Sequence, residues 1–259
     1  MDLQLKGKRA IVTGSTGGIG LAIAVELARE GASVVVNGRT QERVGKALKA
    51  VGSNASGFVG DLSAPSAAAS LIAAHPDTEI LINNLGIYEP KPFPEIDDES
   101  WERIWQTNVM SGIRLSRHYL PRMIAAGWGR ILFISSESAV QIPAEMIHYG
   151  VTKTAQIALA RGMAETTAGS SVTVNSVLVG PTKSEGVSEF VAGMARQKGV
   201  DATSVERDFF AHTRPSSLLK RFIEPAEVAH LVVYLSSPLS SATNGAALRV
   251  DGGVIRSIL

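Results

Sequence analysis

Short apolar segments that alternate with helical segments constrain the fold of this chain more than any other feature. The first, residues 9–13, runs into a glycine-rich turn at 14–20. Apolar residues then recur at helical spacing until Gly31. A second apolar run, residues 33–37, follows at once. Strand, turn, helix and strand in this order predict a βαβ unit with two parallel strands.

The same alternation continues to the end of the chain. It predicts further strands at 55–59, 80–82, 130–134, 172–177 and 246–250, and further helices at 41–51, 65–74, 99–126, around 149–153 and at 225–235. The strands are apolar throughout, as expected when helices cover both faces of a parallel sheet. We therefore predict a doubly wound, Rossmann-like α/β fold, with a parallel sheet of about seven strands and helices on both faces.

One segment breaks this alternation. Residues 182–215 are polar, contain glycine and serine, and show no obvious strand. An insertion of this length in a compact domain is usually a lid or binding loop, or else disordered. No linker divides the rest of the chain. We expect one dinucleotide-binding domain over 1–259, with a substrate lid at about 182–215.

Composition excludes several classes of protein. The 25 basic and 24 acidic side chains are interspersed, which argues against a nucleic-acid surface or a basic membrane patch. Cysteine is absent, so no disulfide or thiol nucleophile exists, and the five histidines lack metal-ligand spacing. No apolar run approaches a membrane span of roughly 20 residues. We expect a cytoplasmic protein with no metal site.

A tyrosine and a lysine four residues apart suggest acid–base chemistry. On a helix, Tyr149 and Lys153 lie on the same face. A nearby cation favours phenolate and lowers the pKa of a tyrosine, which can then exchange a proton near neutral pH. The pair alone proves little, because Tyr-x-x-x-Lys also occurs by chance on surface helices.

The glycine-rich turn suggests a phosphate site. Glycine permits tight bends and close approach of a phosphate, and the following helix N-terminus supplies unpaired N–H groups. The spacing here is Thr13-Gly14-x-x-x-Gly18-Ile19-Gly20, which differs from the Gly-x-Gly-x-x-Gly of common dehydrogenases. By itself such a turn can also be purely structural.

These two motifs stand in register with three others. The chain continues with Asn83-Asn84-Leu85-Gly86, Asn108, Ser136, Tyr149 and Lys153, in that order. In this set it resembles the short-chain dehydrogenase/reductase family, especially 3-oxoacyl-ACP reductase-like members. The resemblance implies a single Rossmann-like domain and an enzyme that interconverts a carbonyl and a secondary alcohol by hydride transfer.

The resemblance extends over residues 5–253 and implies four catalytic residues. Tyr149 would be the general acid/base, and Ser136 would hold the same substrate oxygen. Lys153 would lower the pKa of the tyrosine and bind the nicotinamide ribose. Asn108 would help anchor a water that relays protons toward Lys153.

The cofactor residues implied by the resemblance follow the predicted strands. They are Gly14, Ser15, Thr16, Gly18, Ile19, Gly20, Arg39, Asp61, Leu62, Asn84, Gly86, Tyr149, Lys153, Val179, Gly180 and Thr182. After the second strand, Gly38 stands where NAD-binding relatives have an acidic residue, and Arg39 follows it. Arginine accommodates a 2′-phosphate, so we expect NADP(H), with NAD(H) as the alternative.

Substrate contacts are less well marked. The candidates lie beside the catalytic residues and in the lid: Glu137, Ser138, Gln141, Ile142, His148 and the residues from Glu185 onward. The chain departs from the family pattern in Leu85, where alanine is common, and in Pro181, which is displaced two places. Ser184 stands where a threonine often binds the nicotinamide carboxamide.

Other readings stay open at this point. The fold could serve lyase or isomerase chemistry, or a regulatory protein could retain a relic nucleotide site. The sequence contains neither the Gly-x-Ser-x-Gly motif of a serine hydrolase nor the Gly-Lys-Ser/Thr of a P-loop NTPase. Relatives pack as oligomers, so we expect a small-molecule substrate and a homotetramer or homodimer, without nucleic acid or membrane partners.

Overall fold

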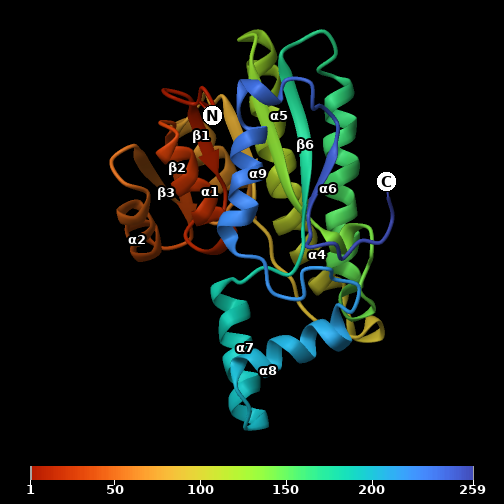
Figure 1. The fold of residues 1–259 in the computed structure, drawn as a ribbon. Coiled ribbons are helices and arrows are strands. Elements are labelled where there is room, and N and C mark those ends of the chain that lie inside the picture. Colours follow the sequence, from red (N-terminus) through yellow and green to blue (C-terminus); the bar gives the residue numbers. More distant parts are fainter. Residues whose placement is uncertain (1, 259) are drawn as a thin grey trace.

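A seven-stranded parallel sheet forms the centre of the protein (Figure 1). The structure, a computed structural model, describes residues 2–258 apart from the side chains at 185, 186 and 190. The expected lid residue Glu185 and the terminal residues 1 and 259 therefore lie outside the side chains described. The strands are β1 (Arg9–Val12), β2 (Ser33–Gly38), β3 (Ala55–Val59), β4 (Ile80–Asn83), β5 (Gly129–Ser136), β6 (Val172–Val179) and β7 (Ala247–Val250).

The strand order is β3-β2-β1-β4-β5-β6-β7, and every pair is parallel. The predicted doubly wound fold is confirmed. β4, β5 and β6 are buried along their whole length, whereas the edge strands β3 and β7 expose some of their residues. Only the central strands therefore need to be apolar on both faces.

Two apolar cores lie on opposite faces of the sheet. On one face pack α1 (Gly18–Arg29), α2 (Gln41–Val51) and α9 (Pro225–Leu235). On the other face pack α3 (Pro65–Ala74), α5 (Ser111–Ala125) and α6 (Ile147–Glu165). Each helix presents its apolar stripe to the sheet, so the two layers hold the loops at the strand ends in place.

The predicted helix over 99–126 is wrong in one respect, because it is interrupted. It forms α4 (Asp98–Trp105), a π-helical turn η2 (Gln106–Met110) and α5. Asn108 lies in this turn and is 1% exposed, with its amide bound to the backbone of Ile87. Single π-turns inside helices are frequent at functional sites. Helical periodicity continues through such a turn, so the sequence pattern could not reveal it.

The segment after β6 is helical. It forms α7 (Glu185–Lys198), α8 (Ala202–Asp208) and a π-helical turn η5 (Phe209–Thr213). Figure 1 shows α7 and α8 extending away from the sheet, beyond the carboxyl ends of its strands. Ser184 and Asp201 cap the two helices by accepting hydrogen bonds from backbone N–H groups.

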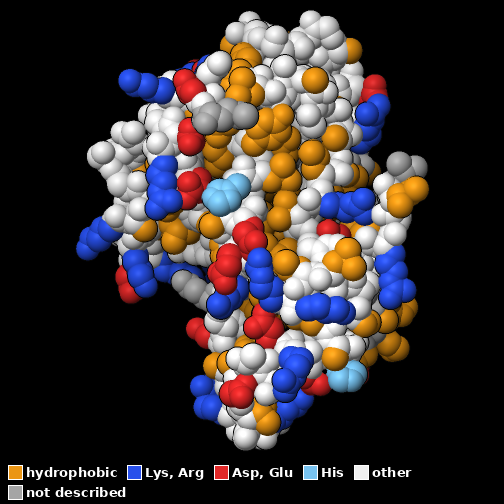
Figure 2. All heavy atoms as spheres, viewed as in Figure 1, with side chains coloured by type: hydrophobic (Ala, Val, Ile, Leu, Met, Phe, Trp, Pro, Cys, Tyr) orange, Lys and Arg blue, Asp and Glu red, His pale blue; other side chains and the backbone are white. Residues whose placement is uncertain are grey.

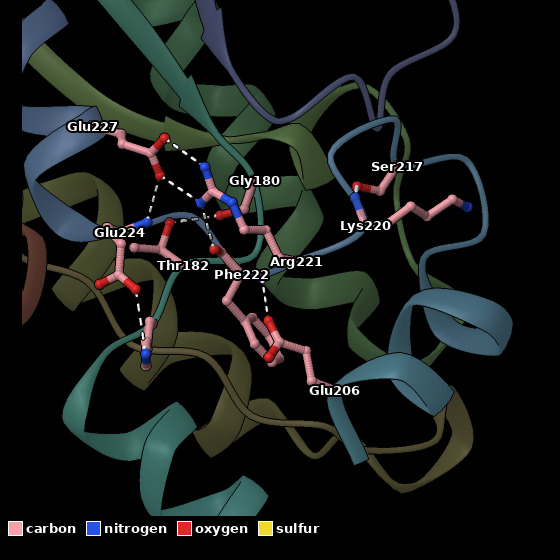
Figure 3. Close-up of polar contacts among 10 residues, drawn as sticks. Gly180, Thr182, Glu206, Ser217, Lys220, Arg221, Phe222, Glu224 and Glu227 are labelled. Carbon is pink, nitrogen blue, oxygen red and sulfur yellow. Dashed lines mark hydrogen bonds and ion pairs between the residues drawn. The ribbon is translucent and has the colours of Figure 1, made fainter. Parts of the chain in front are cut away.

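The two ends of this segment are joined at its base. Thr182 and Ile223 form a parallel bridge, and the Lys183 N–H donates to the Ile223 carbonyl at 2.8 Å. Figure 3 shows Glu206 of α8 turned toward the chain at Phe222, whose N–H donates to its carboxylate at 2.7 Å. Phe222 also packs against Phe209 and Phe210 with ring centroids 5.1 Å apart. These contacts tie the helical segment to residues 222–223, directly before α9 begins at Pro225.

The surface carries mixed charge. Figure 2 shows acidic and basic side chains interspersed over the face that carries α9 and the base of α7. Among residues 2–258 no helix has the length and apolar character needed to cross a bilayer. In the described part of the chain, no cluster of three or more His, Cys, Asp or Glu side chains forms a potential metal site.

Candidate active site

The candidate site lies at the carboxyl ends of β1, β4, β5 and β6. Strand order reverses between β1 and β4, because β2 lies on one side of β1 and β4 on the other. In doubly wound folds, ligands bind outside the carboxyl ends of the strands at such a switch point. The glycine-rich turn follows β1, and the 83–86 turn follows β4.

Two glycines let the turn after β1 fold tightly. Gly14 has φ of +60°, a conformation that L side chains rarely adopt. A Cβ on Gly20 would lie 2.5 Å from the Asn84 amide nitrogen and 2.5 Å from the Gly14 carbonyl. The first helical turn of α1 contains no acidic residue, and Gly17 caps it without a side chain. The N–H groups of this turn are therefore available to an anion.

Thr13 and Asn84 lock the two turns together. The Thr13 hydroxyl accepts hydrogen bonds from the N–H groups of Asn84 and Leu85, each at 2.9 Å. The Asn84 amide donates to the carbonyls of Thr13 and Gly14 at 2.9 and 3.1 Å. Asn84 therefore holds the two turns together through hydrogen bonds. Thr13 is a positioning residue that was not among the site residues expected from the sequence.

Ser15 is fully buried and also acts within the protein. Its hydroxyl donates to the Val12 carbonyl and accepts from the Asn37 N–H. Thr16 packs against the end of β2, where a Cβ on Gly38 would lie 2.3 Å from its methyl group. The glycine at the position that is acidic in NAD-binding relatives is therefore required by packing as well.

Arg39 is exposed directly after β2, and it forms no ion pair with any residue of the described chain. Asp61, after β3, accepts hydrogen bonds from the N–H and the hydroxyl of Ser63 at 3.0 and 2.7 Å. Leu62 is 1% exposed and belongs to the core. Its expected contact with the cofactor therefore cannot come from its side chain.

Ser136 and Tyr149 meet between β5 and α6. The Ser136 hydroxyl accepts from the Ser138 N–H at 3.1 Å, and a hydrogen bond with Ser136 lowers the pKa of Tyr149. The neighbouring Ser135 instead donates to the Lys153 carbonyl at 2.9 Å. The family register, which places the serine thirteen positions before the tyrosine, had favoured Ser136 over Ser135 and Ser138. Ser136 therefore contacts Tyr149, and its catalytic role stays a prediction.

We expected Lys153 to lower the pKa of Tyr149, but this pKa is raised. Burial raises the pKa of Tyr149 to about 12, and the hydrogen bond with Ser136 only partly opposes it. Lys153 Nζ lies 5.6 Å from the centroid of the tyrosine ring. Burial in turn lowers the pKa of Lys153 to about 7. Desolvation disfavours both charged forms, and it is the largest cause of each shift.

Gln156 is a contact of the lysine that the sequence reading missed. The Lys153 ammonium donates to the Ile134 carbonyl at 2.8 Å and to Gln156 Oε1 at 3.2 Å. The other end of the same amide, Gln156 Nε2, donates to the Asn108 carbonyl at 2.6 Å. Gln156 is 1% exposed and one turn of α6 beyond the lysine, so it links Lys153 directly to η2.

The side-chain oxygen, the side-chain nitrogen and the backbone carbonyl of Asn108 all have hydrogen-bond partners within the protein. Its side chain binds both backbone groups of Ile87, and it donates to the Thr152 hydroxyl at 3.0 Å. The expected role of Asn108, which is to help anchor a water on the path to Lys153, stays a prediction. Gly86 passes close by, since a Cβ there would lie 3.4 Å from Lys153 Nζ.

The chain after β6 closes the other side of the site. A Cβ on Gly180 would lie 2.6 Å from the Asp251 carbonyl, so the backbone must run close to β7 there. Val179 is 5% and Thr182 8% exposed, and the Thr182 hydroxyl donates to the Gly180 carbonyl at 2.9 Å (Figure 3). Gly18 lies against the start of the 182–215 segment, since a Cβ on Gly18 would be 3.6 Å from that of Ser184.

The substrate candidates separate into buried and exposed residues. Glu137, Ser138 and His148 are 3%, 2% and 0% exposed, whereas Gln141 and Ile142 are exposed. Both ring nitrogens of His148 are buried and have no hydrogen-bond partner among the described residues, and burial lowers the pKa of His148. Glu137 pairs with Arg214, a residue that sequence reading did not single out because only the fold brings it to the site.

Comparison with known proteins assigns the family. Residues 8–195 match the model of the short chain dehydrogenase family. The chain belongs to the short-chain dehydrogenase family. It is 45% identical to the uncharacterized oxidoreductase YvaG of Bacillus subtilis, over the whole of both chains. It is 32% identical to a D-beta-hydroxybutyrate dehydrogenase of Rhizobium meliloti, covering 95% of this chain and 98% of that one.

Among solved structures, L-sorbose reductase of Gluconobacter frateurii, complexed with NADPH and L-sorbose, superposes with a TM-score of 0.93. The identity is 29% and both chains are covered in full. The predicted family is confirmed, and this short-chain dehydrogenase is an oxidoreductase of that type. The tight glycine turn, the uncapped start of α1 and the exposed Arg39 all fit a nicotinamide dinucleotide.

Proposed function

We propose that this short-chain dehydrogenase is an NADP(H)-dependent oxidoreductase that interconverts a carbonyl and a secondary alcohol. The observation that carries the proposal is the convergence of Ser136, Tyr149 and Lys153 beside the 83–86 turn, which is hydrogen-bonded to the glycine-rich turn. Because a protein side chain does not transfer hydride, the bound nicotinamide would supply it. The similarity to an NADPH-complexed reductase supports the choice of cofactor.

The protein groups supply position and a proton. In the reducing direction, the hydroxyls of Ser136 and Tyr149 donate to the carbonyl oxygen and stabilise the negative charge that develops on it. Tyr149 then gives its proton to that oxygen. The raised pKa of Tyr149 keeps the phenol protonated until this step. Lys153 holds its ammonium close to the ring and opposes the charge left on the tyrosine.

The cofactor preference is argued from the end of β2. No carboxylate stands at Gly38 to repel a 2′-phosphate, and the exposed guanidinium of Arg39 can pair with one. A first test is a binding titration of the purified protein with NADPH and with NADH, followed by nicotinamide fluorescence. Selective NADPH binding supports the proposal, and binding of neither nucleotide would favour a relic regulatory site.

Arg39→Ala tests the phosphate contact. We expect NADPH affinity to fall about tenfold or more while NADH affinity changes little, because only the charge-assisted phosphate contact is lost. Lys46→Ala removes an equal charge from an exposed position further along α2 and serves as the control. Equal losses for both nucleotides would contradict the role of Arg39.

We also propose that residues 182–215 form the lid. The contact of Ser184 with Gly18 supports this, since it brings the start of the segment to the phosphate turn. Lyase or isomerase chemistry is the alternative function, and consumption of one NADPH for each carbonyl reduced excludes it. The expected homotetramer or homodimer and the cytoplasmic location stay predictions.

A further inference from the structure

A buried charged cluster lies beside the reacting groups. Arg214, which follows η5, donates from Nε to Glu137 Oε1 at 3.0 Å and from Nη1 to Glu145 Oε1 at 3.3 Å. The side chains of Arg214 and Glu137 are 10% and 4% exposed, whereas that of Glu145 is 49% exposed. The cluster thus joins the end of the lid to the turn that directly follows Ser136.

One oxygen of this cluster has no partner. Glu137 Oε2 is buried and accepts no hydrogen bond from any residue in the described chain. Buried polar atoms are nearly always hydrogen-bonded, and a buried carboxylate that lacks a partner costs stability. The ion pair with Arg214 uses only Oε1, so the pairing explains why an acid lies here but not why its second oxygen is unsatisfied.

The free oxygen lies near the chemistry. Glu137 begins the short turn η3 (Glu137–Ala139), and it follows Ser136 in the chain. Ser136 caps this turn by accepting a hydrogen bond from the Ser138 N–H at 3.1 Å, so its hydroxyl and Glu137 belong to one tight turn. A substrate whose carbonyl oxygen meets Ser136 and Tyr149 would therefore have its adjacent carbons close to Glu137.

We propose that Glu137, held by Arg214, binds a hydroxyl group of the substrate, so that the substrate class is neutral hydroxylated ketones or aldehydes. The inference rests on the proposed function. A carboxylate oxygen only accepts hydrogen bonds, so its partner must be a donor such as a hydroxyl. One guanidinium faces two carboxylates in the cluster, and this excess of negative charge disfavours a substrate that carries a carboxylate.

The test compares small carbonyl compounds of matched size. Hydroxyacetone, butanone and pyruvate place a hydroxyl, a methyl and a carboxylate next to the same ketone, and a ketohexose adds further hydroxyls. We expect kcat/KM for hydroxyacetone to exceed that for butanone and for pyruvate by at least about tenfold, because the unfilled acceptor rejects analogues without a donor.

Glu137→Gln then tests the residue. We expect the ratio of kcat/KM between hydroxyacetone and butanone to fall at least about tenfold. Saturation-transfer NMR of hydroxyacetone with the cofactor-free protein should show the same loss of contact. Lys198→Ala removes an exposed ion pair with Asp208 in the same lid and is the control. If Glu137→Gln does not fold, Glu137→Asp keeps the charge, and a smaller fall in the same ratio is expected.

The outcomes separate this inference from the proposed function. Equal reduction of butanone and hydroxyacetone, or equal losses for both in Glu137→Gln, would overturn the hydroxyl site and leave the reductase standing. A preference for pyruvate would overturn the neutral substrate class. If nucleotide binds but no carbonyl compound in the panel is reduced, both proposals fail.

Discussion

At the scale of single residues, Tyr149 and Lys153 show that burial sets the direction in which a pKa shifts. A tyrosine beside a lysine predicts a lowered tyrosine pKa, yet the pKa of Tyr149 is raised to about 12 and that of Lys153 is lowered to about 7. Sequence spacing could place the two side chains on one helical face. It could not show that both would be desolvated, because burial depends on how α6 packs against β5 and η2 in the fold.

Removing the phenolic hydroxyl should abolish the chemical step selectively. For Tyr149→Phe we expect kcat to fall about 10³-fold or more, because no other group supplies the proton, while NADPH affinity stays close to that of the wild type. Stopped-flow reduction and fluorescence titration measure the two quantities. Tyr88→Phe is the matched control, since its half-exposed ring lies 6.2 Å from that of Tyr149. Substantial turnover by folded Tyr149→Phe would contradict the mechanism.

The lowered pKa of Lys153 predicts how stability changes with pH. Between about pH 7 and its unfolded value near 10.4, the unfolded chain binds a proton that the folded protein does not. Raising the pH therefore increases the free energy of unfolding, by at most ~1.4 kcal/mol per pH unit. Lys153→Met lacks this dependence.

Denaturant unfolding of the cofactor-free wild type and Lys153→Met, from about pH 7 to about pH 10, measures the effect. The difference in unfolding free energy should move in favour of the wild type as pH rises. Above about pH 10 the raised pKa of Tyr149 acts in the opposite direction, because the unfolded tyrosine ionises first. A difference that does not change with pH would mean that Lys153 titrates normally.

At the scale of helices and strands, the sequence predicts regular elements well and their interruptions poorly. The bounds of α2, β3, α3 and α9 agree with the predicted ranges, since each has clear periodicity and clear end signals. The turn η2 and the helices α7 and α8 were not predicted. A π-turn preserves apolar spacing, and short lid helices bury too little apolar surface to produce a strong pattern.

Gln156 connects two of these elements, and its replacement should shift a pH profile. Gln156→Leu removes an acceptor from the Lys153 ammonium, so we expect the pKa of Lys153 to fall further. Gln156→Glu adds a negative charge at the same place and should raise that pKa. The pKa values in the pH dependence of kcat/KM measure both shifts. Shifts of the same sign in the two variants would show a packing effect only.

At the scale of the whole molecule, the sheet and its two helical layers form the body of the protein, and α7 and α8 are attached to one edge of it. Both apolar cores lie on the sheet, whereas α7 and α8 reach beyond its carboxyl edge (Figure 1). The sheet with its two helical layers follows from the order of strands and helices, and the sequence predicted it, whereas α7 and α8 were not predicted. The contacts between distant segments, such as Glu137 with Arg214, required the three-dimensional structure.

If the segment acts as a lid, cofactor binding should slow its opening. We expect NADPH to reduce amide hydrogen exchange in α7 and α8, because its phosphates would occupy the turn against which Ser184 packs. Exchange in the second half of α5, at the amino edge of the sheet, should change little. Mass spectrometry of peptides measures both regions. Equal exchange in α7 and α8 with and without NADPH would argue against a lid.

The bridge between Thr182 and Ile223 has a consequence for protein engineering. It brings the two ends of a forty-residue excursion side by side at one point, just after β6. We therefore expect that the residues between these two ends can be replaced by another sequence without changing the register of any strand. Sequence variation among related enzymes is expected to concentrate in this segment. Substrate preference can change there while the residues proposed for hydride transfer stay the same.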